Sequence, residues 1–327
     1  MIVVTGGAGF IGSALTWKLN SRGIKDILIV DRLGTAEKWR NLVSLKYLDF
    51  QDKTVFINKL ESGYYKDSIT AIFHMGACSS TMETDADYLM ENNFHYTLRL
   101  AQWWKNHQST RFIYASSAAT YGDGEFGYSD DYSVLDKLCP LNMYGYSKHL
   151  FDCYALREGW LKKIVGLKFF NVFGPNEYHK GEMRSLINKA YKRVRDDGVM
   201  SLFKSYHPDY QHGQQKRDFI YIKDVVEMIL YFMDNSDVGG IFNIGTGKAR
   251  SWNDLADAIF KALNKSVNIE YIEMPEQLRE KYQYFTQADL NRLQSIGCTH
   301  QCMSLEDAIR DYVCNYLTGK RYLGNEQ

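Results

Sequence analysis

The chain begins with Met1-Ile-Val-Val-Thr5-Gly6-Gly-Ala-Gly9-Phe-Ile-Gly12, and this stretch decides the fold. Its first residues form an apolar run typical of a buried strand, and three glycines follow in a G-x-x-G-x-x-G pattern. Gly6 and Gly9 allow a tight turn that approaches a pyrophosphate, whereas Gly12 allows a helix to pack against the sheet. The free N–H groups at the start of that helix attract an anion. The stretch therefore predicts a dinucleotide-binding turn.

The next predicted strand ends in an acidic residue about 20 residues beyond the glycine turn. Asp31 in that position favours hydrogen bonds to the adenosine ribose of NAD. Arg32 and Lys38 follow closely, and their charges suit the 2′-phosphate of NADP unless Arg32 is only a solvated loop residue. We expect NADP, tightly bound and recycled, with NAD as the alternative.

Short apolar runs alternate with helical segments through the first half of the chain, which is typical of a parallel sheet covered on both faces. Strands are expected at 2–4, 27–30, 71–75, 111–115 and 164–170, with a helix at 11–19 after the first. The predicted fold class is α/β, a Rossmann-type doubly wound parallel sheet. Such sheets bind ligands beyond the carboxyl ends of their strands.

The pattern loosens after about residue 172. It includes a basic helix at 184–195, an irregular polar stretch at 204–215, a strand at 219–222 leading into a helix, and a strand near 269–272. We expect a nucleotide-binding Rossmann domain of residues 1–172 and about 217–250. A smaller, interleaved mixed α/β substrate-binding domain would take residues 173–216 and 251–327.

The composition excludes some classes of protein. Basic and acidic residues both number 39, so the formal net charge is +0, which argues against nucleic-acid binding. No apolar run approaches the roughly 18 residues that span a bilayer, and no secretory signal pattern is present. The six cysteines show no C-x-x-C pair and no zinc-like spacing. We therefore expect a cytoplasmic protein without a metal site or a membrane partner.

A second motif contains candidate catalytic residues. Tyr144-Gly-Tyr-Ser-Lys148 places a phenol and an ammonium four residues apart, on one face of a helix. A neighbouring ammonium would lower the pKa of Tyr144, which would then act as an acid or base near neutral pH. Ser117 closes the strand Tyr114-Ala-Ser-Ser117, where its hydroxyl would position a reacting hydroxyl or ketone.

Together these motifs resemble the extended short-chain dehydrogenase/reductases, and Arg217-Asp-Phe-Ile-Tyr-Ile-Lys-Asp224 and Phe242-Asn-Ile-Gly-Thr-Gly247 look like later motifs of that family. The dehydratases of the family carry Thr-Asp-Glu after the serine strand. Ser117-Ala-Ala has no carboxylate, which counts against elimination. Within the family, Tyr178-His-Lys180-Gly-Glu182-Met resembles the second catalytic loop of the ADP-heptose 6-epimerases.

This resemblance implies an isomerase acting on a nucleotide sugar. Hydride would leave C6″ and return to it from one nicotinamide face, and rotation of the ketone about C5″–C6″ would present its other face. Because the oxygen then points the other way, a second acid or base is needed. Tyr144 would serve one epimer and Lys180 the other, unless Lys180 is an ordinary loop lysine.

The resemblance also implies a set of ligand contacts. Its cofactor residues are Gly6, Gly9, Phe10, Ile11, Gly12, Asp31, Arg32, Lys38, Lys53, Met75, Gly76, Ala77, Cys78, Ser79, Asn92, Lys148 and Val172. Its substrate residues are Ser117, Asn171, Lys180, Glu182, Lys189, Phe203, Arg217 and Tyr282, with Arg217 pairing to the diphosphate. Phe203 and Tyr282 are equally typical of core aromatics.

Two features depart from the subfamily. Glu182 stands where a small residue is expected, and a carboxylate is awkward beside a diphosphate. The stretch 206–215 is longer than usual, and its His207 and His212 read as solvated loop residues. The alternatives are another epimerase or reductase acting on a UDP- or GDP-sugar, and a non-catalytic NAD(P)-binding sensor. The resemblance further implies a homo-oligomer, specifically a homopentamer, and a role in lipopolysaccharide inner-core precursor synthesis in a Gram-negative bacterium.

Overall fold

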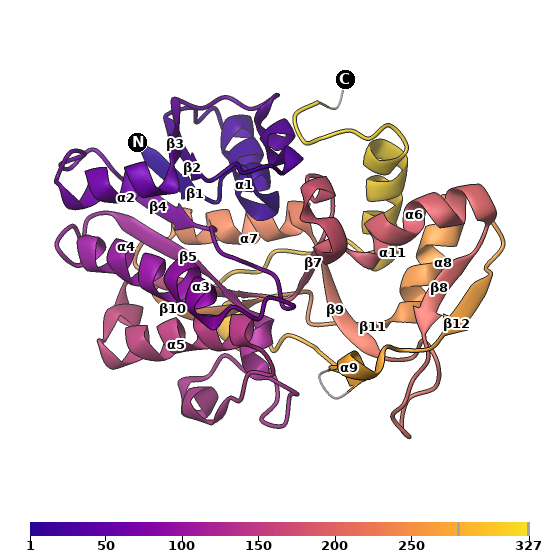
Figure 1. Cartoon of the computed structure of the whole chain (residues 1–327). Coiled ribbons are helices and arrows are strands. Elements are labelled where there is room, and N and C mark those ends of the chain that lie inside the picture. Colours follow the sequence, from indigo (N-terminus) through magenta and orange to yellow (C-terminus); the bar gives the residue numbers. More distant parts are fainter. Residues whose placement is uncertain (280–281, 326–327) are drawn as a thin grey trace.

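The computed structural model describes residues 1–279 and 282–325. Residues 280–281 and 326–327, which belong to the predicted substrate-binding domain, lie outside the described residues. A seven-stranded parallel sheet in the order β10-β6-β5-β4-β1-β2-β3 forms the centre of the molecule (Figure 1). Its strands are β1 (Ile2–Thr5), β2 (Ile27–Asp31), β3 (Asp49–Asp52), β4 (Ala71–His74), β5 (Arg111–Ser117), β6 (Val165–Phe169) and β10 (Gly240–Ile244).

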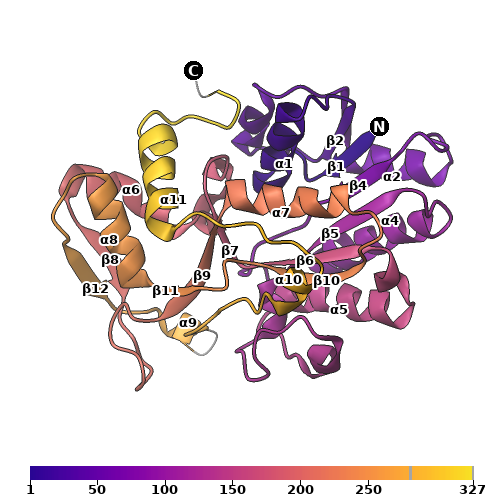
Figure 2. The same cartoon turned by 180° about the vertical axis from the view of Figure 1, so that it is seen from behind.

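Helices cover both faces of this sheet, as Figures 1 and 2 show from opposite sides. On one face lie α2 (Lys53–Glu61), α3 (Ala86–Leu89), α4 (Tyr96–Lys105) and α5 (Met143–Arg157), and on the other lie α1 (Phe10–Ser21) and α7 (Ile222–Asp234). Successive strand residues alternate between two cores: Ile2 and Val4 face α1, whereas Val3 faces the opposite core. The predicted doubly wound parallel sheet is therefore confirmed.

Two smaller sheets lie beyond the carboxyl ends of the main strands. One has the order β11-β9-β7 and the other pairs β12 with β8. Their strands are β7 (Asn171–Phe173), β8 (Met200–Phe203), β9 (Lys216–Tyr221), β11 (Ala249–Ser251) and β12 (Ile269–Ile272). The accompanying helices are α6 (Leu186–Asp197), α8 (Trp252–Ala262), α9 (Glu276–Arg279), α10 (Asn291–Ser295) and α11 (Leu305–Asp311).

The structure corrects several predicted elements. The basic helix begins at Leu186 rather than at residue 184, because the Ser185 hydroxyl caps it by accepting the Asn188 N–H. Strand β3 was not predicted, since it is a half-exposed edge strand with few apolar residues. The strand expected at 219–222 is β9, and it pairs with β7 and β11 rather than joining the main sheet. Among the described residues, no helix is long and apolar enough to cross a membrane.

Candidate active site

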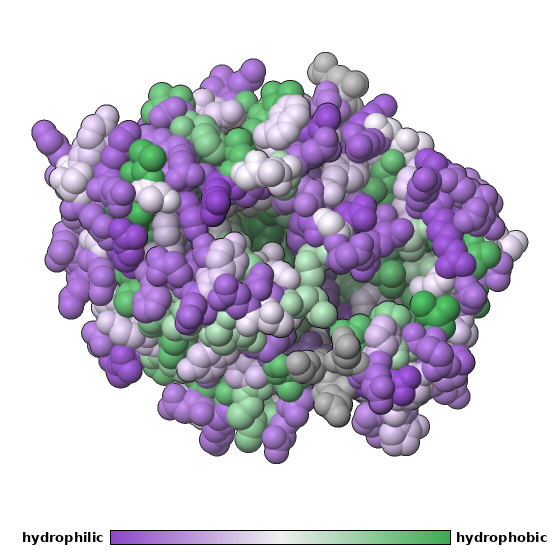
Figure 3. All heavy atoms as spheres, viewed as in Figure 1, coloured by the Kyte–Doolittle hydropathy of each residue, from purple (hydrophilic) through white to green (hydrophobic). Residues whose placement is uncertain are grey.

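A cavity of about 860 Å³ opens where the carboxyl ends of the main strands meet the smaller sheets. Figure 3 shows a hollow near the middle of this face of the molecule. Residues from the glycine turn line it, as do Phe203 of β8 and Tyr282 of the irregular segment after α9. The site therefore lies where an open parallel sheet is expected to bind its ligand.

The glycine turn forms a cradle that only glycine permits. Gly6 has a φ of +64°, and a Cβ there would stand 2.6 Å from the Gly76 backbone. A Cβ on Gly12 would stand 2.3 Å from the Gly6 carbonyl oxygen. Helix α1 starts at Phe10 with Gly9 as N-cap and no side-chain cap, so its first N–H groups are open to a phosphate. This turn fits the pyrophosphate of a dinucleotide.

Asp31 ends β2 beside this turn, and charged side chains surround it. Its carboxylate accepts the Ala8 N–H at 3.0 Å and pairs with Lys38 Nζ at 2.6 Å. Arg32 is exposed and lies close enough to Lys53 to lower the pKa of that amine, after burial, which is the larger cause. Arg32 therefore lies within electrostatic reach of Lys53 near the cofactor end, and a guanidinium suits an added phosphate group.

Ser117, Tyr144 and Lys148 all line the cavity at the junction of β5 and α5. Ser117 is the last residue of β5, and Tyr144 and Lys148 lie one turn apart on α5. Lys148 Nζ donates a hydrogen bond to the carbonyl oxygen of Ala115 at 2.8 Å. Burial lowers the pKa of Lys148 to about 8.

The predicted lowering of the Tyr144 pKa by Lys148 is wrong. Burial raises the pKa of Tyr144 above its usual value, and a hydrogen bond with Ser117 offsets only part of that rise. The Lys148 ammonium is held by the Ala115 carbonyl, which the sequence could not show. Tyr144 therefore keeps its proton at neutral pH and is suited to donate it.

A buried ion pair supports this wall of the cavity. Asp152 and Lys168 are 0% and 1% exposed, and their charged groups lie 3.2 Å apart. Asp152 accepts the Ser116 hydroxyl at 2.7 Å. Lys168 Nζ donates to Thr120 Oγ1 at 2.6 Å, and that hydroxyl donates to the Ser117 carbonyl oxygen at 2.8 Å. The pair thereby fixes the backbone that carries Ser117, and sequence reasoning missed it because its members lie 16 residues apart.

Lys180 enters the same cavity from a short 3₁₀ turn at Tyr178–Met183. Gly181 interrupts this turn with a φ of +54°. The Lys180 ammonium lies 5.2 Å from the centre of the Phe10 ring, a favourable cation–π distance. Burial lowers the pKa of Lys180, and the Glu177 carboxylate opposes this fall. Lys180 therefore releases its proton more readily than an exposed lysine.

Glu177 anchors the turn and was also missed. Its carboxylate is fully buried and accepts the Ser185 N–H and hydroxyl, each at 2.6 Å, and the Tyr312 hydroxyl at 2.9 Å. No helical or strand periodicity marks this residue, because it lies in a loop whose partners come from distant elements. It holds the start of α6 and the Lys180 turn together.

Two of the predicted substrate residues, Arg217 and Glu182, do not line the cavity. Arg217 is buried, and its guanidinium donates to the carbonyl oxygens of Lys216 and Gln283. It lies 5.9 Å from the centre of the Trp252 ring and 5.1 Å from that of the Tyr282 ring. It does not line the cavity, so its contact with a diphosphate stays a prediction. The Glu182 side chain is 91% exposed, which keeps its charge in solvent.

The cavity brings most of the predicted site residues together. It is lined by Gly6, Gly9, Phe10, Ile11, Gly12, Asp31, Lys38, Met75, Gly76, Ala77, Ser79, Ser117, Tyr144, Lys148, Asn171, Val172, Lys180, Lys189, Phe203 and Tyr282. Six predicted residues are not in its lining: Arg32, Lys53, Cys78, Asn92, Glu182 and Arg217. Lys53 and Asn92 instead hydrogen-bond each other, and Cys78 N–H donates to Asn93. Sequence reasoning omitted Arg184 and His179, which line the cavity beside Lys180.

Comparison with known proteins shows which family this chain resembles. Residues 2–245 match the NAD dependent epimerase/dehydratase family. The chain is 55% identical over 317 residues to ADP-L-glycero-D-manno-heptose-6-epimerase of Nitratidesulfovibrio vulgaris, covering 97% of this chain and 98% of the relative. It is 52% identical to the protein of the same name from Fusobacterium nucleatum, with the same coverage of both chains.

A solved structure agrees with these relatives. The crystal structure of Helicobacter pylori ADP-L-glycero-D-manno-heptose-6-epimerase matches with a TM-score of 0.77 and 26% sequence identity. The match covers 96% of this chain and 94% of that chain. The similarity therefore extends through both the main sheet and the smaller sheets.

Proposed function

Because the chain belongs to the NAD dependent epimerase/dehydratase family, we propose that it interconverts ADP-D-glycero-β-D-manno-heptose and its L-glycero epimer at C6″. It is an isomerase that acts on a nucleotide sugar. The role we assign to it is supply of the precursor for the lipopolysaccharide inner core, in the cytoplasm and as a homo-oligomer. The first part, residues 1–172 and about 217–250, would hold the cofactor, and the remainder would hold the sugar nucleotide.

One observation carries this proposal. Two proton carriers, Tyr144 and Lys180, line one cavity but belong to two different elements, α5 and the turn Tyr178–Met183. A dehydrogenase with one fixed acid needs only the first of them. An epimerase that reduces both faces of a ketone needs a proton donor for each orientation of the oxygen.

When bound, the nicotinamide supplies the means to take a hydride from C6″ and to give it back. Tyr144, held protonated by burial, donates to the carbonyl oxygen in one orientation, and Ser117 fixes that oxygen by a hydrogen bond. Lys180, whose pKa is lowered by burial, takes the proton from the hydroxyl in the other orientation. The two environments push the two pKa values in opposite senses, which separates an acid from a base.

The cofactor we propose is NADP. Arg32 and Lys53 lie within electrostatic reach of each other, and Lys38 already pairs with the Asp31 carboxylate. That pairing reduces the negative charge that would repel a 2′-phosphate. Arg32 is exposed at the cofactor end, whereas Lys53 already hydrogen-bonds Asn92.

Arg32→Ala tests the cofactor assignment. We expect affinity for NADP to fall about tenfold, since one charged hydrogen-bonded contact contributes roughly 1.5 kcal/mol or more, whereas NAD affinity stays the same. Titration of the cofactor-stripped protein with each dinucleotide measures this. Equal loss of both affinities, or no loss of either, would contradict NADP as the preferred cofactor.

The epimerase activity itself is tested with the protein as isolated and ADP-D-glycero-β-D-manno-heptose in deuterated water. NMR at C6″ should show growth of the L-glycero epimer with little solvent deuterium at that carbon. A C6″–H that exchanges freely would exclude direct hydride return. No conversion by protein that contains intact nicotinamide would favour a UDP- or GDP-sugar instead, and a panel of those sugars is the control.

A further inference from the structure

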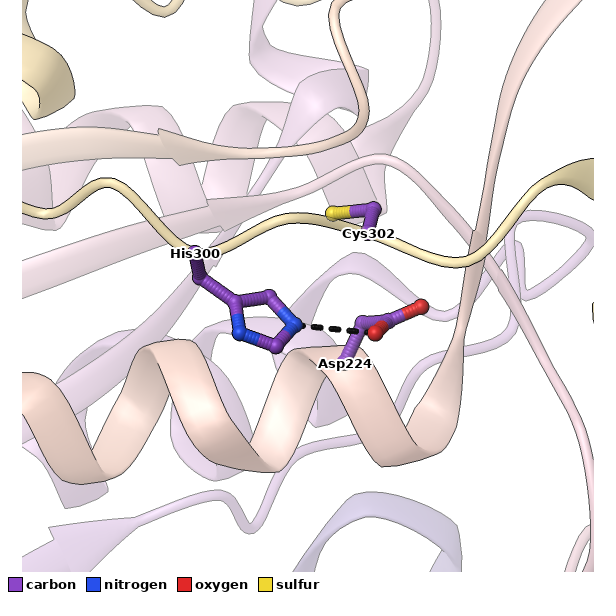
Figure 4. A group of neighbouring side chains, drawn as sticks. All are labelled: Asp224, His300 and Cys302. Carbon is purple, nitrogen blue, oxygen red and sulfur yellow. Dashed lines mark hydrogen bonds and ion pairs between the residues drawn. The ribbon is translucent and has the colours of Figure 1, made fainter.

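Three side chains with different donor atoms converge on the side of α7, outside the cavity (Figure 4). Asp224 lies in the first turn of α7 and is almost fully buried. His300 and Cys302 lie in the segment between α10 and α11, which passes over that turn. One ligand atom from each residue lies within 4.8 Å of the other two.

Hydrogen bonds already orient the Asp224 and His300 side chains toward each other. His300 Nε2 and Asp224 Oδ1 are 2.9 Å apart, and the other Asp224 oxygen accepts the Met303 N–H at 3.1 Å. A backbone donor thus fixes the carboxylate so that one oxygen faces the imidazole, in the way that outer partners orient metal ligands. His300 is exposed, so a cation can enter from solvent.

The donor set selects a class of cation. Thiolate and imidazole suit zinc and similar borderline metals, whereas Mg²⁺ and Ca²⁺ prefer oxygen alone. In a tetrahedral zinc site, neighbouring ligand atoms are roughly 3.3–3.7 Å apart. The three donors are within a small side-chain adjustment of that spacing. A water molecule would take the fourth position.

We propose that Asp224, His300 and Cys302 form a binding site for a divalent cation of the zinc class, which ties the segment before α11 to the first turn of α7. On binding, the Cys302 thiol releases its proton to solvent and becomes a thiolate. The cation takes the position between His300 Nε2 and Asp224 Oδ1, and the neutral imidazole carries its single proton on Nδ1. The site is separate from the cavity residues and does not depend on the proposed epimerase activity.

No zinc-like spacing in the sequence marks this site. Cys298-Thr-His300-Gln-Cys302 has single-residue gaps, and Asp224 lies 76 residues before His300. Cys298 is a neighbouring buried thiol that is not one of the three converging groups. It therefore provides a matched control in the same segment.

The test is titration of the metal-stripped full chain with Co²⁺, followed by displacement with Zn²⁺. We expect one equivalent of Co²⁺ with a thiolate-to-cobalt absorption band, complete loss of that band in Cys302→Ser, and at least tenfold weaker binding in His300→Ala. Cys298→Ser should bind as the parent does. Zn²⁺ should raise the Tm of the parent and of Cys298→Ser but not that of Cys302→Ser.

Three outcomes would overturn the proposal. One is a folded parent that gives no thiolate band with Co²⁺. Another is a band of equal intensity in Cys302→Ser, which would place the metal elsewhere. The last is equal loss in Cys298→Ser and Cys302→Ser. Equal Tm values of the metal-free variants show that loss of binding is not loss of folding.

Discussion

Tyr144 and Lys180 are both candidate proton carriers in the cavity, but different kinds of structure hold them in place. The Tyr144 wall is built from a seven-residue strand and a fifteen-residue helix, with a buried ion pair behind it. The Lys180 wall is a six-residue 3₁₀ turn broken at Gly181 and held by one buried carboxylate. The first wall fixes its acid by regular structure, whereas the second depends on a few side-chain hydrogen bonds.

The difference indicates how the two groups are tuned. Burial raises the pKa of Tyr144, and it lowers the pKa of Lys180. Burial disfavours whichever form is charged, so one environment yields a proton donor and the other a proton acceptor. Changes on the Tyr144 wall should therefore affect catalysis and stability, and changes on the Lys180 wall should affect mainly catalysis and its pH dependence.

Tyr144→Phe should have the largest effect. Removing the phenol removes proton transfer in one orientation, and kcat for epimerisation should fall by about 10²–10⁴-fold. The reduced nicotinamide absorbance after addition of each epimer separately would show which epimer is still oxidised. Normal turnover in both directions would exclude Tyr144 as the acid.

Lys180→Ala should lower epimerisation by about 10²-fold or more. In the oxidation assay this variant should still oxidise the epimer that Tyr144→Phe no longer oxidises. Lys192→Ala, at an exposed lysine of α6, is the matched control and should leave kcat unchanged. If both variants retained oxidation of the same epimer, Tyr144 and Lys180 would not serve opposite faces. Full epimerisation by Lys180→Ala would remove Lys180 from the mechanism.

Asp152→Asn should destabilise the fold by about 3–5 kcal/mol, because it leaves Lys168 buried without its counter-ion. Chemical unfolding measures this. Asp136→Asn, on the exposed surface of the same region, should change stability by less than about 0.5 kcal/mol. Equal stability of the two variants would mean that the ion pair does not support this wall.

Glu177→Gln should have the smallest effect on kcat and should act on its pH dependence, although an amide has one acceptor oxygen fewer for Ser185 and Tyr312 and also weakens the anchor of the turn. The Glu177 carboxylate raises the pKa of Lys180 against the lowering by burial, so a neutral amide should let that pKa fall further. Since the neutral amine is the base, the rise of activity with pH should move to lower pH. A pH–rate profile with each epimer measures it, and Asp209→Asn in an exposed loop is the control. A shift to higher pH would contradict this role.

The sequence alone predicted the class of fold and the family, and both are confirmed. The glycine turn of residues 6–12 and the alternation of apolar runs are local patterns, so they can be read without knowing any contact. The same holds for the one-turn spacing of Tyr144 and Lys148, which any helix enforces.

Only the tertiary structure decided the rest. The raised pKa of Tyr144 depends on burial, and the site of Lys148 Nζ depends on a carbonyl 33 residues away. The Asp152–Lys168 pair, the Glu177 anchor and the convergence of Asp224 with His300 and Cys302 join segments that share no periodicity. Sequence patterns report what neighbouring residues do to one another along the chain, whereas solvent exclusion and convergence are properties of the packed molecule.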